Sequence, residues 1–108
     1  MKRLMKWWRA RRARAVHRRE AAAWQASADR HYLEASRLPA RSPRKVYHYC
    51  LSFRDAERAE AHRALAEGTM DGWNRAAECD RDAAWWDERA RQRGVGEVVQ
   101  WTGAAHAS

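Results

Sequence analysis

The sequence predicts an all-α protein, a three-helix antiparallel bundle with a long first helix. Three observations lead to this fold class: alanine fills 23 of 108 positions, apolar residues recur at steps of three and four, and two short breaks interrupt the helical pattern. Alanine is the strongest helix former, and arginine and glutamate follow it closely. We expect one domain, with a basic N-terminal arm or helix extension at residues 1–19, a bundle at 20–94 and an irregular C-terminal tail at 95–108.

The first helix is expected from about Leu4 to Arg37. Its second half carries a stripe of mostly small residues at steps of three and four, which puts them on one helix face. The members of this stripe are Ala21, Trp24, Ala28, His31, Ala35 and Leu38. The segment "LPARSP" then ends the helix, because Pro39 disfavours the α conformation in the residue before it.

The second helix is expected from Pro43 to about Glu67. Ser42 is a preferred N-cap residue, and proline suits the first helical position. Gly68 is expected to end the helix as the residue just past its C-cap. After the short connection "GTMDG", the chain returns as a neighbouring antiparallel helix.

The third helix is expected to run to about Arg93 and to stop at Gly94. Its apolar face comprises Trp73, Ala76, Cys79, Ala83, Trp86 and Ala90. The tail that follows has no helical period, and "EVVQW" at residues 97–101 is expected as a short strand or as an apolar strap over the bundle.

The predicted core is thin. Leucine, valine and phenylalanine together occupy 11 positions, and isoleucine is absent. Tryptophan, present seven times, supplies part of the missing volume. A small domain with so few large aliphatic side chains usually needs an oligomer, a partner or a covalent staple. We therefore expect a protein partner or a homo-oligomer.

Four tryptophans occur as two adjacent pairs, Trp7–Trp8 and Trp85–Trp86. Neighbouring residues on an α-helix point about 100° apart, so both members of a pair cannot lie at the centre of one narrow stripe. Trp86 shares a register with the core stripe, which predicts a core position for it and a surface position for Trp85. By the same argument Trp8 lies on the apolar side and Trp7 among arginines.

The formal net charge of +8 is concentrated at the N-terminus. Residues 1–19 hold nine Lys or Arg and no acid, whereas residues 20–108 hold 13 basic and 14 acidic residues. A separate basic arm indicates a polyanionic partner, and nucleic acid or a ribonucleoprotein is the first expectation. The expected nucleic-acid-binding residues are Lys2, Arg3, Lys6, Trp7, Arg9, Arg11, Arg12, Arg14, Arg18 and Arg19.

Two other interpretations stay open. The surplus aromatic residues fit a protein-binding adaptor or inhibitor, such as a mobile element encodes, that docks on a larger complex through Tyr47, Trp85 and Trp101. Apolar residues among the first cations also fit a short anchor on a membrane surface, although the arginine-rich stretch after them lacks a broad apolar face.

No catalytic, metal or cofactor site is expected. Cys50 and Cys79 fall at different levels of the predicted hairpin, about 16 Å apart along the helix axis, which is too far for a disulfide. Both are interpreted as small hydrophobic residues in a reducing, cytoplasmic compartment. His62 falls level with Cys79, but no third orienting residue accompanies this thiol–imidazole pair, and a non-enzymatic protein is therefore expected.

Overall fold

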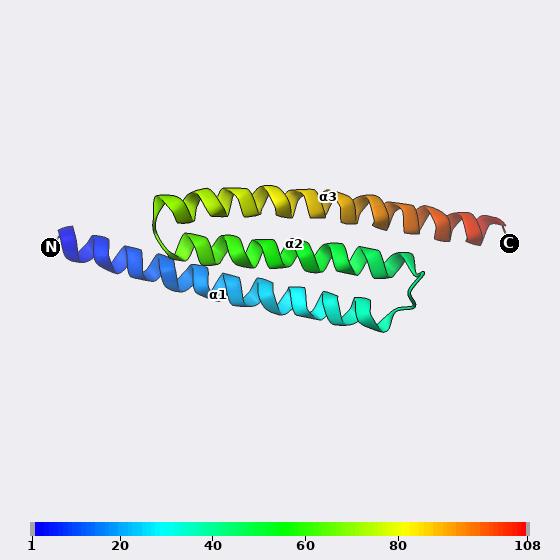
Figure 1. Ribbon diagram of the computed structural model, residues 1–108, viewed down its shortest axis with the longest axis horizontal. Coiled ribbons are helices and arrows are strands. Elements are labelled where there is room, and N and C mark those ends of the chain that lie inside the picture. Colours follow the sequence, from blue (N-terminus) through cyan, green and yellow to red (C-terminus); the bar gives the residue numbers. More distant parts are fainter. Residues whose placement is uncertain (1, 108) are drawn as a thin grey trace.

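The computed structural model describes the backbone of residues 2–107 and the side chains of residues 2–93. Three α-helices occupy the described backbone, α1 (Lys2–Arg37), α2 (Pro43–Ala66) and α3 (Met70–Ala107). Consecutive helices run antiparallel, so α1 and α3 point in the same direction (Figure 1). The prediction of an all-α protein with three helices and a long first helix is confirmed.

The helices lie side by side in a single layer with α2 in the middle (Figure 1). α2 packs against α1 on one side and against α3 on the other, and within the described part of the chain α1 and α3 do not touch. The molecule is accordingly long and thin, with principal extents of 71 × 22 × 20 Å. Each of the outer helices therefore has one packed edge, and both broad faces of the layer are open.

The helix ends follow the expected residues. Ser42 is the N-cap of α2 in an extended conformation, although its side chain makes no capping hydrogen bond, and Pro43 opens the helix. Gly68 follows the C-cap with φ +68°, a conformation that glycine adopts at no steric cost. At the start of α3, the Thr69 hydroxyl accepts a hydrogen bond from the Gly72 backbone N–H at 2.9 Å and so caps this helix.

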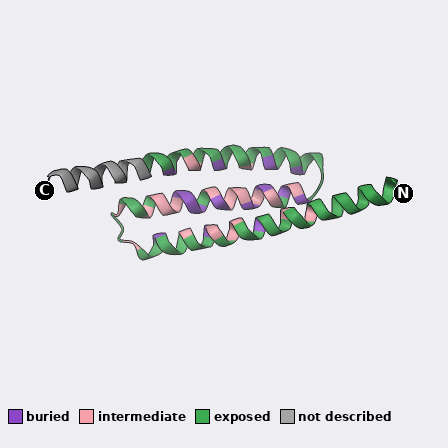
Figure 2. Ribbon diagram, turned by 180° about the vertical axis from the view of Figure 1, so that it is seen from behind, coloured by how far each residue is buried: buried purple, intermediate pink, exposed green. Residues whose placement is uncertain are grey.

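Alanine forms the seams between the helices. Ala21, Ala28 and Ala35 are buried on α1 at intervals of seven residues, and the buried alanines of α3 keep the same interval: Ala76, Ala83 and Ala90. Burial is confined to α2 and to the edges of α1 and α3 that face it (Figure 2). Since alanine lets helix backbones approach closely, the seams are tight but bury little apolar area. The thin core is confirmed, because Cys50 and Leu51 are the buried apolar residues other than alanine in the described part.

The expected end of the third helix was wrong. The backbone of α3 continues through Gly94 and Gly96 to Ala107, in place of an irregular tail at residues 95–108 or a strand at 97–101. A glycine inside a helix costs about 1 kcal/mol relative to alanine, and this cost does not by itself stop a helix. Gly68 ends α2 because the chain also turns there with a positive φ.

Gly72 marks the closest approach of α3 to α2. It is buried, and a Cβ atom added to it would overlap the backbone oxygen of Ala64. We expect Gly72→Ala to destabilise the fold by about 1 kcal/mol or more, although alanine is the better helix former by a similar amount. Chemical denaturation measures this loss, with the exposed Asn74→Ala as the control for helix propensity alone. Equal stabilisation by both substitutions would contradict the close approach.

Candidate nucleic-acid interface

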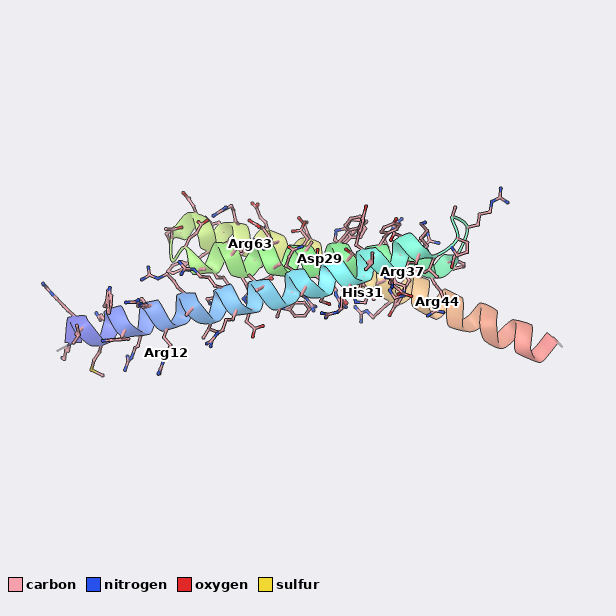
Figure 3. All side chains as sticks on the ribbon, turned by 90° about the horizontal axis from the view of Figure 1, so that it is seen from below. Arg12, Asp29, His31, Arg37, Arg44 and Arg63 are labelled. Atoms are coloured by element: carbon pink, nitrogen blue, oxygen red, sulfur yellow. The ribbon has the colours of Figure 1, made fainter. Side chains whose placement is uncertain are left out.

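The first turns of α1 project beyond the rest of the layer. His17 of α1 and His62 of α2 lie level with each other, with their Nδ1 atoms 3.0 Å apart. α2 ends one helical turn later at Ala66, so residues 2–12 of α1 have no neighbouring α2 residue (Figure 1). Figure 3 shows Arg12 on this projecting part, away from the other helices. The projection arises because α1 is longer than the helix it packs on.

Six of the nine cations expected at the interface lie on the projecting residues 2–12, and the other three follow on the next two turns of α1. Arg14 is half-buried, and the others are exposed: Lys2, Arg3, Lys6, Arg9, Arg11, Arg12, Arg18 and Arg19. None of the nine forms an ion pair within residues 2–93. The described ion pairs all lie in the body of the protein, so the positive charge of the arm is not neutralised by the fold.

Both tryptophans of the arm are exposed. Trp7 is 48% exposed and its ring lies 5.2 Å from the Arg11 guanidinium, a cation–π contact. Trp8 is 58% exposed, and its ring meets that of Trp7 edge-on at 5.4 Å. The expectation that Trp8 joins the apolar side of a core was wrong, because α2 ends before it reaches the level of this residue.

The residues expected at a protein interface occupy different environments. Trp85 is 55% exposed with the Arg89 guanidinium 5.2 Å from its ring, so its predicted surface position is confirmed. Trp86 packs against the core cluster of Cys50, Leu51 and Ala90, as its register predicted. Tyr47 packs against the same cluster and is only half-exposed. Trp101 lies outside the described side chains.

A row of aromatic rings that the sequence did not predict crosses the layer. It begins at Tyr32 on α1, continues over α2 and ends at the tryptophan pair of α3. The signal for the α2 members was the i, i+4 spacing of Tyr49 and Phe53, whose rings stack at 6.3 Å. The interface residue expected from the sequence, Tyr47, lies two residues earlier and packs against the core cluster instead.

A buried carboxylate joins the three helices near their middle. Asp55 of α2 is 0% exposed; its Oδ2 accepts a hydrogen bond from Ser27 Oγ of α1 at 2.5 Å, and its Oδ1 accepts one from Arg54 Nε at 2.9 Å. The same guanidinium donates to Asp87 of α3 at 2.9 Å. This hydrogen bond lowers the pKa of the Asp87 carboxyl. The network therefore ties the two outer helices to α2 through one arginine and one carboxylate.

Ser27, His31 and Asp55 are residue types that hydrolases use together, but their order here differs from a catalytic triad. Ser27 donates its proton to the carboxylate, and His31 Nε2 lies 3.9 Å from that same carboxylate. A nucleophilic serine instead donates to the histidine, which the carboxylate orients. The geometry of this cluster serves to hold α1 on α2.

Two histidine pairs join α1 to α2 at equivalent places. His17 pairs with His62, and His31 pairs with His48 through Nδ1 atoms 3.1 Å apart. Such a pair needs one nitrogen that bears a proton and one that accepts it. Burial lowers the pKa of His31, and the neighbouring His48, Arg54 and Arg30 lower it further, whereas Asp55 raises it. The net shift of the His31 pKa is downward, so folding favours the neutral form of this side chain.

We expect the protein to lose stability as the pH falls below the ordinary histidine pKa of 6.5. His31 binds a proton more weakly in the folded than in the unfolded state, so stability is complete above that value and declines below it. Chemical denaturation at about pH 7.5 and about pH 5.5 measures the effect in a range above the titration of most carboxyls. The decline should be smaller in His31→Gln. An unchanged decline in that variant would assign the effect to other groups.

The two cysteines are free, as expected from their levels in the hairpin. Cys50 is buried, and burial raises the pKa of its thiol. Burial, together with a hydrogen bond to Glu57, raises the pKa of Cys79 to about 11. Both groups are thus thiols at neutral pH, and His62, which was expected level with Cys79, pairs with His17. Within the described residues, no group of three or more His, Cys, Asp or Glu is arranged to hold a metal ion.

Comparison of the chain with protein-family models, with curated proteins and with solved structures finds no match. Among the described residues, no helix combines the length and the apolar character that crossing a bilayer requires.

Proposed function

We propose that this protein binds nucleic acid, free or in a ribonucleoprotein, through the projecting part of α1, and that it does so as a binding protein without catalysis. One observation carries the proposal: nine cations without an acidic partner among the described residues lie on the N-terminal part of α1, and six of them lie on residues 2–12, which extend beyond α2. Unpaired Lys and Arg side chains at this density attract a phosphate backbone and release its counterions. Contacts of this kind position a protein on nucleic acid and carry no sequence information.

The half of α1 that contacts α2 keeps the arm in place. Its alanine seam and its two histidine pairs fix α1 on α2, so the arm is the continuation of an anchored helix. A helix that is already formed loses less conformational entropy on binding than a disordered basic tail. The body of the protein, with nearly balanced charge, serves as the support of this helix.

Salt-dependent binding tests the proposal. Fluorescence anisotropy with labelled oligonucleotides at several salt concentrations should give a slope of log K against log[salt] of about −3.5 for single strands, or −4.5 for duplex, if about five cations contact phosphates. Affinity should depend little on sequence. Deletion of residues 2–12, which removes six of the nine cations, should weaken binding strongly and make the slope shallower, while the remaining helices stay folded because α2 ends before the level of these residues.

A matched pair of variants separates the arm from general charge. Arg9→Gln with Arg12→Gln removes two unpaired arm cations, whereas Arg75→Gln with Arg91→Gln removes two cations that are paired with acids in the body. Both double variants lose the same charge. The first should make the slope shallower, by about 1.4 to 1.8 where both arginines contact phosphates, and the second should leave it nearly unchanged.

Absence of binding at low salt, or an unchanged slope after deletion of the arm, would overturn the proposal. The adaptor or inhibitor interpretation would then take its place. Exposed Trp85 on α3 is the observation that favours this alternative, since exposed tryptophan is enriched at the centres of protein interfaces.

A further inference from the structure

Five aromatic side chains form a continuous row across the layer, which we call the aromatic row. Successive ring centroids lie 5.5 Å apart between Tyr32 and Tyr49, 6.3 Å between Tyr49 and Phe53, and 4.8 Å between Phe53 and Trp86. Trp85 completes the row at 4.6 Å from Trp86. The row thus crosses α1, α2 and α3 in turn, and it spans the full width of the layer.

The aromatic row is open to solvent. Tyr32 is 55% exposed, Phe53 is 42% exposed and Trp85 is 55% exposed, while Tyr49 and Trp86 are half-buried. Within the described part of the chain, no other element covers the face that carries the row, because α1 and α3 each pack only on α2. Exposed aromatic residues that touch one another in a line form an apolar patch, and such patches mark binding surfaces.

Cations accompany the aromatic row. The Lys45 ammonium lies 6.0 Å from the Tyr49 ring centroid, and the Arg89 guanidinium lies 5.2 Å from that of Trp85. Asp87 and Glu88, the acids next to Trp86 in sequence, are paired with Arg54 and Arg91. Asp82, one turn before the tryptophan pair, is the other acid of residues 82–93. Aromatic rings combined with lysine and arginine suit a ligand that has both flat rings and negative charge.

A polar groove with both arginine and aspartate side chains lies between the arm and the aromatic row. A shallow groove at the junction of α1 and α2 is lined by Arg18, Gln25, Asp29 and Arg63, and Arg63 donates to the Gln25 side chain at 3.3 Å. Arg63 and Asp29 are seen along this junction in Figure 3. From Arg18 to Tyr32 the distance along α1 is about 21 Å at 1.5 Å per residue. A flexible polyanion held by the arm is therefore within reach of the row.

We propose that the aromatic row stacks the bases of a single-stranded nucleic acid whose phosphates the arm holds. This inference rests on the proposed function and specifies its ligand. Aromatic side chains in a basic setting bind single strands by stacking on successive bases, which a duplex keeps stacked inside. Such stacking tolerates any sequence, because every base has a flat face. The row would add affinity for single strands to the sequence-independent phosphate contacts of the arm.

The test compares strands that have the same phosphates but differ in their bases. Labelled oligothymidylate and its abasic counterpart, both about 20 nucleotides long so as to exceed common single-strand site sizes, are titrated into the full chain by fluorescence anisotropy. We expect oligothymidylate to bind at least about 5-fold more tightly, since one stacked base accounts for that factor. A duplex of equal length should lack the added affinity that stacked bases give to the single strand. This comparison takes into account that the salt slopes of duplex and single strand differ.

Two tryptophans of α3 provide a matched pair of variants. Trp85 is 55% exposed within the aromatic row, and Trp73 is 53% exposed on the same helix and outside the row. Trp85→Ala should abolish most of the preference for oligothymidylate over the abasic strand and leave the salt slope unchanged. Trp73→Ala should retain both the preference for oligothymidylate and the salt slope of the unchanged protein. Phe53→Leu, which keeps an apolar side chain, should reduce the preference without unfolding the protein.

The other possible outcomes overturn the stacking proposal, the arm proposal or both. Equal binding of abasic and base-bearing strands would overturn the stacking proposal and leave the arm proposal intact. Absence of binding by either strand at low salt would overturn both. A concentration-dependent dimer in sedimentation that Trp85→Ala dissociates, together with unchanged strand preference in that variant, would show that the aromatic row binds a second copy of the chain instead.

Discussion

Asp55→Ala should destabilise the protein by about 3–5 kcal/mol, the cost of removing one partner from a buried ion pair. The carboxylate is fully buried and accepts hydrogen bonds from Ser27 and Arg54, so its removal leaves both donors without their acceptor. Arg54 would keep its hydrogen bond to Asp87 of α3 but lose the carboxylate that accepts from its Nε. A domain of this size has only about 5–15 kcal/mol of stability, so a large unfolded fraction is expected.

Chemical denaturation followed by circular dichroism measures this loss, since the folded protein is helical. Asp80→Ala is the matched control, because Asp80 is an exposed carboxylate of α3 and surface substitutions usually change stability by less than about 0.5 kcal/mol. Asp55→Asn is a second variant that keeps the size of the side chain and removes its charge. Equal stability of Asp55→Ala and Asp80→Ala would show that the network does not hold the layer together.

Trp86→Ala should be the second large loss, near 3 kcal/mol, at the lower end of the range for tryptophan truncation in cores. Trp86 packs on the cluster of Cys50, Leu51 and Ala90, and its ring lies 4.8 Å from that of Phe53. The buried core is otherwise mostly alanine, so these neighbours can fill only part of the space that the indole leaves. The lower end applies because Trp86 is half-buried rather than fully enclosed.

Trp85→Ala provides the comparison for Trp86→Ala, since the two residues are adjacent and chemically identical. Trp85 is exposed and contacts Arg89 and its neighbour Trp86, so its truncation should cost about 0.5 kcal/mol or less. Urea denaturation of both variants decides the matter. A larger loss at Trp85 would mean that α3 is rotated about its axis relative to the described register.

Local sequence patterns predicted most of the helices. Pro39, Pro43 and Gly68 act on the backbone of their own neighbours, so the ends that they set can be recognised without knowledge of tertiary contacts. The stripe that contains Ala21, Ala28 and Ala35 was likewise recognisable, because the helical period alone places these residues on one face.

The errors concern places where a neighbouring helix is decisive. Trp8 has an apolar register, but burial requires a partner at the same level, and α2 ends before that level. Gly94 resembles a helix end, yet glycine only weakens a helix, and α3 continues through it. The local pattern does not show how far one helix extends beside another. It also does not show whether a helix continues past a residue of low helix propensity.

The sequence by itself determined that the protein is helical, where its first two helices end, which residue of the Trp85–Trp86 pair packs on the core and where the positive charge lies. These properties depend on backbone preferences, helical period and composition. The tertiary structure decided that the helices form one layer, that Asp55 links them and that five aromatic rings from three helices meet in a row. Such contacts depend on the levels and faces at which separate helices meet, and side chains far apart in the chain have no local signal of their proximity.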